Sequence, residues 1–311
     1  MPVTPPPPAG TGPATGARRA PRIGIVVTDA YAPEDPDHDT PPLIEALRGR
    51  GAEASPVVWH DDTVDLARFD LLAVRSPWDY PERPAAFAAW LDRAEAATRV
   101  VNPPATMRWN LDKHYLRELA GAGIRIVPTD YAKTRDAAAA ALARHERAVV
   151  KPAVSAGARD TGLFEASDPR ALALAERIVA GGGVAMVQPE IAELTAGHEK
   201  ALYLIDGAFT HAIAKGALLE TGGGLVGGVY EENPVPVEAT DAERAFAAAV
   251  LRAVSAVTGA PTPLYARVDL VDAAAYGLCL LEVELVEPAL NLHVAPEVTA
   301  VVADALLRAA G

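Results

Sequence analysis

The alternation of apolar and polar residues along the chain predicts a series of strands and helices that begins at residue 22. Short runs of β-branched and aliphatic residues are typical of buried strands, and apolar residues three or four positions apart are typical of helices with one buried face. The predicted strands span residues 22–27, 55–59, 69–75, 99–104 (with a break), 124–129, 147–153, 184–191, 200–205, 208–215, 265–271 and 278–285. The predicted helices span residues 40–49, 83–97, 110–123, 135–145, 168–180, 240–258 and 296–309.

The order of these elements indicates the fold class. A strand, a helix and two further strands between residues 22 and 75 predict a parallel α/β sheet, with functional residues at the carboxyl ends of its strands. From residue 106 onward, antiparallel strands such as the hairpin that turns at Asp206-Gly207 mix with helices and predict an α+β region. Residues 218–234 hold too many glycines for a regular element, and we expect a long mobile loop of the kind that often serves as a lid.

Composition narrows the classes of partner and compartment. The chain has 311 residues, is 50% hydrophobic and carries a net charge of -13 without any Lys/Arg-rich run, so we expect no nucleic-acid partner. Its single cysteine, Cys279, excludes an internal disulfide framework and suits a reducing cytoplasm. Residues 1–21 lack the apolar core of a secretory signal and are predicted to form a flexible tail. No uninterrupted apolar stretch of about 18 residues occurs, so no membrane span is expected.

Carboxylates repeat on two strands that are close in sequence. Because side chains alternate between the faces of a strand, Glu282 and Glu284 share one face, and so do Arg267 and Asp269. If the two strands pair, Asp269, Glu282 and Glu284 meet on one surface and repel one another unless a cation lies between them. Oxygen donors on rigid strands suit Mg²⁺ shared with phosphate oxygens. The alternative is a solvated polar face on an edge strand.

Lys151 is a candidate phosphate ligand. It ends the apolar strand "AVV" and precedes the small-residue turn "SAGARDT". The backbone N–H groups of such a turn can complete an anion cradle. The alternative is a lysine that only solvates the surface, since the segment is not a Walker A motif.

Six motifs in order resemble the ATP-grasp superfamily, most closely its glutathione-synthetase-like branch, which includes amino-acid ligases and the O-ureido-serine cyclo-ligase of cycloserine biosynthesis. They are "RSPWDY", "NPPATMRWNLDKHYLRELAGAGIRIVPT", "VVKPAVSAGARDTG", "VQPEI....GHEKALYLIDGAFTHAIAKG", "YARVDLV" and "LLEVELVEP", and they span nearly the whole chain from residue 22. The resemblance implies an ATP-grasp fold behind an N-terminal parallel-sheet domain. It places a substrate-side domain at 22–105, a small subdomain at 106–186 and a metal-binding subdomain at 187–311.

The resemblance also implies a nucleotide site. Lys113 and Lys151 would contact the phosphates of ATP, and the backbone of Ser155, Ala156 and Gly157 would close over them. Gln188 and Glu190 would lie near the exocyclic amine of adenine, with Ile191 offering its backbone. Glu199 would bind the ribose hydroxyls, although His198 stands where the family usually has glycine.

A metal and transition-state site follows from the same resemblance. Asp269, Glu282 and Glu284 would hold Mg²⁺, although many relatives have Asn where Glu284 stands. Arg267 would stabilise charge on the transferring phosphoryl group, and Lys215 would reach phosphate or substrate.

"RSPWDY" lies at a predicted strand end, where the family places substrate. Arg75 would bind an amino-acid carboxylate with help from Ser76, Trp78 and Tyr80 would wall the pocket, and Asp79 would take an ammonium group. The alternative is a structural turn anchored by a buried tryptophan. Glu287 and Asn291 either face the same pocket or lie at the surface.

These features predict an ATP-dependent carboxylate–amine ligase that acts on small amino-acid-like substrates through an acyl phosphate and releases ADP and phosphate. Intermolecular amide or dipeptide formation is preferred over ring closure within one molecule, because it is the commoner outcome in the superfamily. A non-catalytic ATP-binding module and a kinase that stops at phosphorylation are two further possibilities. A cytoplasmic location is expected. The sequence identifies neither the substrates, the pathway nor the oligomeric state, although many members of the superfamily form a homodimer.

Overall fold

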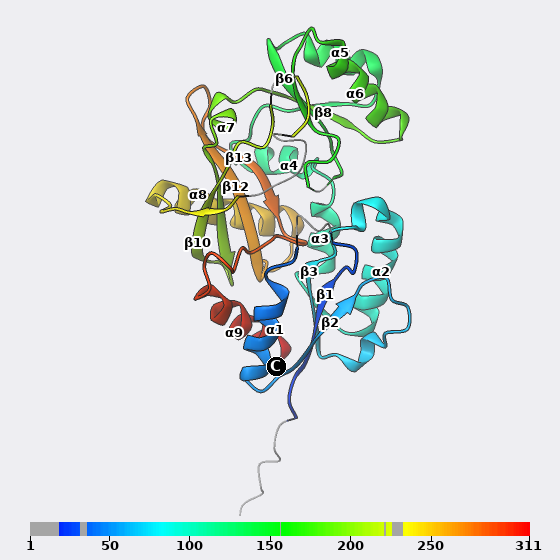
Figure 1. The fold of residues 1–311 in the computed structure, drawn as a ribbon, viewed down its shortest axis with the longest axis vertical. Coiled ribbons are helices and arrows are strands. Elements are labelled where there is room, and N and C mark those ends of the chain that lie inside the picture. Colours follow the sequence, from blue (N-terminus) through cyan, green and yellow to red (C-terminus); the bar gives the residue numbers. More distant parts are fainter. Residues whose placement is uncertain (1–18, 32–35, 156, 221, 226–232) are drawn as a thin grey trace, which may run out of the picture.

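The computed structural model describes residues 19–31, 36–155, 157–220, 222–225 and 233–311. Most of the expected N-terminal tail, Ala156 and part of the expected glycine-rich lid therefore lie outside the described residues. The chain forms three sheets, and Figure 1 shows the N-terminal sheet at one end, the sheet with α5 and α6 at the other, and the largest sheet between them.

The N-terminal sheet is parallel, with strand order β2-β1-β3-β4. Its elements are β1 (Arg22–Val27), α1 (Thr40–Gly49), β2 (Glu53–Val58), β3 (Leu71–Ser76), α2 (Pro84–Ala97) and β4 (Arg99–Val101), with short 3-10 turns η1 (Leu66–Arg68) and η2 (Tyr80–Glu82). The predicted parallel α/β sheet is confirmed, because its strands are the β-branched runs that require burial on both faces.

The second sheet is antiparallel, with strand order β5-β8-β6-β7. Its elements are β5 (Asp130–Ala132), α5 (Arg135–Leu142), β6 (Arg147–Pro152), β7 (Gly162–Glu165), α6 (Pro169–Ala180) and β8 (Ala185–Pro189). Helices α5 and α6 bury alanines and aliphatic residues against it. The expected subdomain boundary between residues 186 and 187 falls inside β8.

The largest sheet is also antiparallel, with strand order β11-β10-β9-β12-β13. Its elements are β9 (Glu199–Ile205), β10 (Ala208–Lys215), β11 (Val235–Pro236), α8 (Asp241–Thr258), β12 (Tyr265–Ala273), β13 (Gly277–Glu284) and α9 (Val298–Ala310). The predicted hairpin between β9 and β10 is confirmed, and its turn residues Asp206 and Gly207 have positive φ of 54° and 77°.

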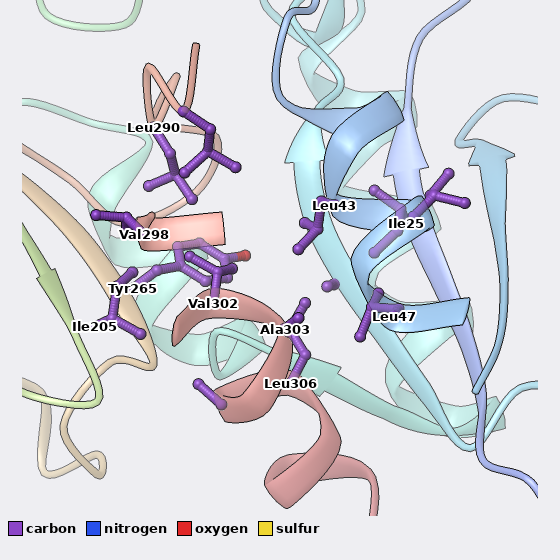
Figure 2. Packing of buried hydrophobic residues seen from close by; sticks show 14 of the residues in the cluster. Ile25, Leu43, Leu47, Ile205, Tyr265, Leu290, Val298, Val302, Ala303 and Leu306 are labelled. Atoms are coloured by element: carbon purple, nitrogen blue, oxygen red, sulfur yellow. The ribbon is translucent and has the colours of Figure 1, made fainter. Parts of the chain in front are cut away.

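One hydrophobic core joins the N-terminal sheet to the largest sheet. Leu43 and Leu47 of α1 pack with Ile25 of β1 on one side and with Ala303 and Leu306 of α9 on the other (Figure 2). The same cluster continues through Ile205 and Tyr265 of the largest sheet. Because the core is continuous, the two sheets are held in a fixed relation.

Two predictions between the first and second sheets were wrong. The helix expected at 110–123 is divided into α3 (Pro104–Asn110) and α4 (Tyr115–Gly121), because the backbone N–H of Lys113 donates to the carbonyl of Ala153 at 2.8 Å instead of continuing a helix. The strand expected at 124–129 is only an isolated bridge between Ile126 and Leu280. Strand β7 and the short helix α7 (Ala192–Thr195) were not predicted from the sequence.

The buried side chain of Asn102 links the N-terminal sheet to the largest sheet through hydrogen bonds. Its Nδ2 donates to the carbonyls of Tyr265 and Leu285 at 2.8 Å each, and its Oδ1 accepts from the backbone N–H of Leu264 at 2.6 Å. The Tyr265 hydroxyl donates back to the carbonyl of Val74 at 2.5 Å. The Asn102 side chain thus provides hydrogen-bond partners for backbone groups at the start of β12 and just after the end of β13.

We predict that Asn102→Ala lowers the free energy of unfolding by about 2–4 kcal/mol, because it leaves buried backbone groups without partners. Urea denaturation measures the change. The exposed Asn233 provides the control variant Asn233→Ala, which should change stability by less than about 0.5 kcal/mol. Equal stability of the two variants would show that the hydrogen bonds of Asn102 between the sheets do not contribute to the free energy of unfolding.

Candidate active site

A cleft lies between the β5–β8 sheet and the β9–β13 sheet. Both sheets and the segments beside them contribute side chains to it. Its walls include Tyr80, Asn110, Lys113, Val127, Val149, Lys151, Ser155, Gly157, Leu163, Gln188, Glu190, Ile191, Leu194, Glu199, Lys215, Arg267, Asp269, Leu281, Glu282, Glu284 and Glu287. The structure thus brings together nearly all the residues expected to bind nucleotide and metal.

The register of β12 and β13 places the predicted charged residues on one face. Arg267 pairs with Glu284 and Asp269 pairs with Glu282 in the antiparallel ladder. The four residues therefore share one surface, as predicted, and all of them line the cleft, with β13 at the edge of its sheet.

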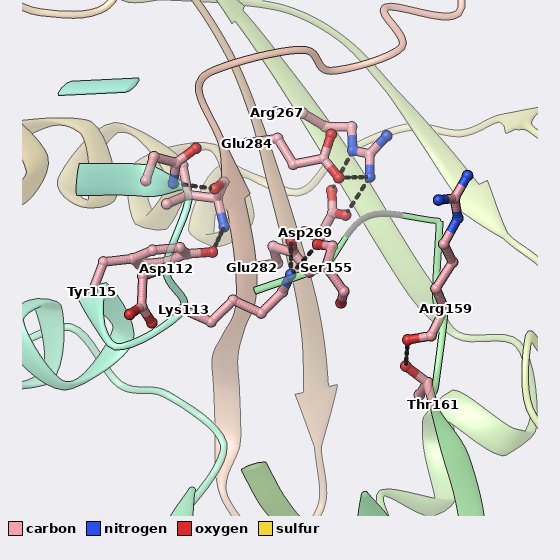
Figure 3. Close-up of polar contacts among 12 residues, drawn as sticks. Asp112, Lys113, Tyr115, Ser155, Arg159, Thr161, Arg267, Asp269, Glu282 and Glu284 are labelled. Atoms are coloured by element: carbon pink, nitrogen blue, oxygen red, sulfur yellow. Dashed lines mark hydrogen bonds and ion pairs between the residues drawn. The ribbon is translucent and has the colours of Figure 1, made fainter. Parts of the chain in front are cut away.

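Cations of the chain neutralise these carboxylates (Figure 3). Arg267 donates from Nε to Asp269 Oδ1 at 2.9 Å and from Nη2 to Glu284 Oε1 at 2.5 Å. Lys113 Nζ lies 3.2 Å from Glu282 Oε1. The repulsion between the carboxylates is therefore relieved by basic side chains from separate segments of the chain.

Lys215 of β10 forms a second bridge in the cleft. Its Nζ lies 2.6 Å from Asp269 Oδ2 and 3.1 Å from Glu199 Oε1. Glu199, expected at the ribose, is thus fixed beside the charge cluster. Lys215 is 3% exposed, so the loss of its charge would leave Glu199 without a cationic partner and Asp269 with Arg267 alone.

Burial and neighbouring charges shift the pKa values in opposite directions. Burial opposes ionisation of Asp269, but Arg267 and Lys215 together hold its pKa below the usual range. Burial, with Asp269 and Glu282 nearby, raises the pKa of Glu284 to about 8 although Arg267 opposes this. Such separated pKa values are characteristic of functional sites.

Lys151 stands apart from the paired cations. Its side chain lines the cleft, and the ammonium group forms no hydrogen bond or ion pair with the described residues. Burial, with the nearby charge of Lys113, lowers its pKa while Glu282 opposes the shift. Lys113 is held beside it by donating from Nζ to the carbonyl of Ser155 at 2.8 Å. This pair of lysines forms a positive end of the cleft.

The turn after β6 and the segment after β8 supply the other expected nucleotide contacts. Gly157 lies in the turn with a φ of 60°, next to Ser155 in the wall. Gln188 donates from Nε2 to Thr129 Oγ1 at 2.8 Å. Glu190 is bound to Arg147 at 2.5 Å, so its carboxylate is less available to an adenine amine than expected. Buried Ile191 and the apolar residues Val149, Leu163, Leu194 and Leu281 make this end suitable for a flat ring.

The carboxylates fit magnesium only together with a phosphate-bearing ligand. Among the described residues no group of three or more His, Cys, Asp or Glu side chains is arranged to hold a metal by itself. The donor set Asp269, Glu282 and Glu284 has the hard oxygen chemistry that Mg²⁺ prefers, and Mg²⁺ normally takes only one or two protein carboxylates beside phosphates and water. The residues present therefore fit Mg²⁺ that arrives with a nucleotide.

Most side chains of the "RSPWDY" segment lie outside the cleft in which they were expected to bind substrate. Of its predicted substrate residues only Tyr80 lines the cleft, whereas Arg75, Ser76, Trp78 and Asp79 do not. Asp79 accepts from Trp59 Nε1 at 2.7 Å and is bound to Arg83, so it is not free to take an ammonium group.

Arg75 and Trp78 hold the segment after β13 instead. Arg75 Nη2 donates to the carbonyl of Pro288 at 2.5 Å, and Trp78 Nε1 donates to that of Glu287 at 3.1 Å. Ser76 donates to the Asp37 carboxylate at 2.5 Å, and this carboxylate accepts from the first N–H groups of α1. These side chains therefore hold the backbone of neighbouring segments, and their role at the substrate stays a prediction. Nε and Nη1 of Arg75 are buried without a hydrogen bond.

Two residues that support β13 were missed by the sequence analysis. Asn110 donates from Nδ2 to the carbonyl of Val283 and accepts at Oδ1 from the N–H of Leu285, both at 2.8 Å. The hydroxyl of Tyr115 accepts from the N–H of Val283 at 3.1 Å. They satisfy the free edge of β13 beside the carboxylates, and no local pattern signals such a contact across more than 160 residues.

Known proteins with the same architecture identify the class. The solved ATP-grasp ligase PsnB, in a complex with a precursor peptide and AMPPNP, aligns with a TM-score of 0.61 at 20% identity over 93% of this chain and 98% of that one. Together with the three-sheet architecture, this similarity shows that the chain has the ATP-grasp fold.

More similar relatives identify the family. The chain is 38% identical over 280 residues to the cycloserine biosynthesis protein DcsG of Streptomyces lavendulae, which covers 87% of this chain and 93% of that protein. The crystal structure of the D-cycloserine synthetase DcsG aligns with a TM-score of 0.86 at 33% identity over 93% of this chain and 100% of that one. A family model described as the D-cycloserine synthetase DcsG N-terminal domain matches residues 23–102. The chain belongs to the DcsG family of ATP-dependent ligases.

We predict that Mg²⁺ binds at least about tenfold more weakly to the free protein than to its ADP complex, because phosphate oxygens must complete the donor set. Isothermal titration with Mg²⁺, with and without ADP, measures the difference. Glu282→Gln should abolish the nucleotide-dependent part, while the exposed Glu45→Gln should keep it. Equal affinity with and without ADP would contradict the shared site.

Proposed function

We propose that this protein is a ring-closing ATP-dependent ligase that activates the carboxylate of an O-ureido-serine-like amino acid and joins it to a nitrogen of the same molecule. The observation that carries the proposal is similarity over the whole chain to a D-cycloserine synthetase, including the N-terminal domain. This supports ring closure over the intermolecular reaction that was preferred from the sequence.

The first chemical step would be transfer of the γ-phosphoryl group of ATP to the substrate carboxylate. Lys113 and Lys151 form the positive end of the cleft and would bind the phosphates. Arg267, which lies between Asp269 and Glu284, would face the charge that develops on the transferring group. Mg²⁺ bound through Asp269, Glu282 and Glu284 would supply charge neutralisation of the phosphate oxygens.

The second step would convert the acyl phosphate into the cyclic product. The nitrogen nucleophile forms a bond to the acyl carbon, the carbon–oxygen bond to phosphate breaks, and phosphate leaves with the electron pair. Because both reacting groups belong to one molecule, the protein has to fold the substrate rather than recruit a second one. Ring closure on a small substrate therefore needs an enclosed site.

No helix in the described part of the chain combines the length and apolar character needed to cross a bilayer. A cytoplasmic location and a homodimer stay predictions.

Product analysis tests the reaction. The purified protein is incubated with Mg²⁺-ATP and O-ureido-serine, alone and paired with other amino acids, and ADP, phosphate and product mass are measured. Release of ADP with O-ureido-serine alone supports ring closure when the product has the mass of the substrate less water, or of cycloserine once water has removed the carbamoyl group from the ring nitrogen as ammonia and carbon dioxide. A product that joins two compounds would favour the intermolecular reaction instead, and a stable phosphorylated product would indicate a kinase.

We predict that Lys151→Met weakens ADP binding by about 10–100-fold, because it removes an unpaired cation that makes charge-assisted hydrogen bonds to phosphate. Isothermal titration measures the dissociation constant. The exposed Lys133→Met is the matched control and should bind ADP as the wild type does. A dissociation constant within about twofold of the wild type for Lys151→Met would contradict its phosphate role.

A further inference from the structure

Glu287 differs from the other acidic residues of the cleft. Six carboxylates line the cleft: Glu190, Glu199, Asp269, Glu282, Glu284 and Glu287. Five of them have a Lys or Arg partner within 4 Å, from Arg147, Lys215, Arg267 or Lys113. Within the part of the chain that the structure describes, Glu287 alone has no such cation. Among the described carboxylates of the cleft, Glu287 is therefore the one that no Lys or Arg of the chain compensates.

The chain holds Glu287 in place through its backbone and leaves the carboxylate in the cleft. Its carbonyl accepts from Trp78 Nε1 at 3.1 Å, and the next carbonyl, of Pro288, accepts from Arg75 Nη2 at 2.5 Å. Further along the segment, the Asp39 carboxylate accepts from the N–H groups of Leu290 and Leu292 at 2.5 and 2.8 Å. These anchors come from the N-terminal domain and fix the segment that carries Glu287 against the cleft.

The surroundings of the carboxylate suit proton transfer. The side chain of Tyr80, which is 4% exposed, lines the same cleft as Glu287. The charged groups that face it are Lys113 before α4, Glu282 on β13 and Arg267 on β12. Burial raises the pKa of Glu287 to about 7, while Tyr80 and Lys113 oppose the shift. A base with a pKa near the working pH is efficient, because it is both available and able to take a proton.

We propose that Glu287 is the general base that accepts the proton of the nitrogen nucleophile during ring closure. The inference rests on the proposed function. As the nitrogen–carbon bond forms and phosphate leaves with the electron pair of the breaking carbon–oxygen bond, the nitrogen loses its proton to a Glu287 carboxylate oxygen. Glu287 then returns the proton to solvent and is regenerated. The cyclised product still carries the carbamoyl group on its nitrogen, and hydrolysis of that group to ammonia and carbon dioxide yields cycloserine.

In this proposal, different side chains of the cleft act in the phosphorylation step and in the ring-closing step. The lysines and Arg267 act on the phosphoryl group, and Glu287 acts on the nitrogen. Removing the base should therefore leave phosphorylation of the carboxylate intact. The acyl phosphate would form but would not close the ring.

A trapping experiment distinguishes the steps. Wild type, Glu287→Gln and Glu287→Asp are incubated with Mg²⁺-ATP and O-ureido-serine, with and without hydroxylamine, which attacks acyl phosphates without a protein base. Glu287→Gln keeps the size of the side chain and the backbone carbonyl that accepts from Trp78, so the fold should be retained. We expect cycloserine formation to fall by about 10²–10⁴-fold in Glu287→Gln, while hydroxamate formation stays within about threefold of the wild type. Glu287→Asp should recover part of the ring closure, and the exposed Glu45→Gln should behave as the wild type.

The pH profile gives a readout that a structural or binding role would not change. A base must be ionised to act, so kcat of the wild type should rise as the pH increases through about 7 and then level off. Glu287→Gln should lose this dependence, and Glu287→Asp should keep it. A variant with a raised KM but an unchanged kcat and pH profile would show that Glu287 only binds the substrate, and the proposal would be overturned.

The outcomes also separate this inference from the proposed function. If the wild type forms neither cycloserine nor hydroxamate, the proposed function fails. If the wild type forms both and Glu287→Gln closes the ring at the same rate, only the role of Glu287 fails. Parallel loss of hydroxamate and cycloserine in Glu287→Gln would place the residue in the phosphorylation step and would equally overturn the proposal.

Discussion

Carboxylates that lie side by side on a half-buried surface repel one another unless cations compensate their charge. The arrangement of the cleft depends on this compensation. Asp269, Glu282 and Glu284 are brought side by side by the β12–β13 ladder. Their compensation comes from Arg267 on the same sheet, Lys215 on β10 and Lys113 between α3 and α4. The charge cluster therefore depends on cations from three segments that are distant in sequence. A charged ligand can replace these ion pairs with its own.

The uncompensated groups show where a ligand fits. Lys151 is a cation without a carboxylate partner, and Glu287 is a carboxylate without a cationic one, among the described residues. A ligand with phosphate at one end and a nitrogen nucleophile at the other complements this asymmetry. That is the charge distribution expected of ATP and an amino-acid substrate in an ATP-grasp ligase of the DcsG family.

The N-terminal domain contributes to the cleft mainly by positioning. Asn102 and Tyr265 join its sheet to β12 and β13, while Asp39, Arg75 and Trp78 bind the backbone of residues 287–292. The part of the chain that matches the DcsG N-terminal family thus reaches the cleft through the segment that carries Glu287. The N-terminal domain therefore fixes the position of residues 287–292 relative to the cleft.

The sequence by itself determined the elements with strong local patterns and the face on which their charges lie. The period of two in "YARVDLV" and "LLEVEL" placed Arg267, Asp269, Glu282 and Glu284 correctly, because side-chain alternation is a property of the strand itself. Only the tertiary structure decided which cation meets which carboxylate, that Asp79 is already bound by Trp59 and Arg83, and that "NLDKHY" breaks between two helices. Those outcomes depend on hydrogen bonds and ion pairs between residues far apart in the chain, and such contacts leave no periodic signal in the sequence.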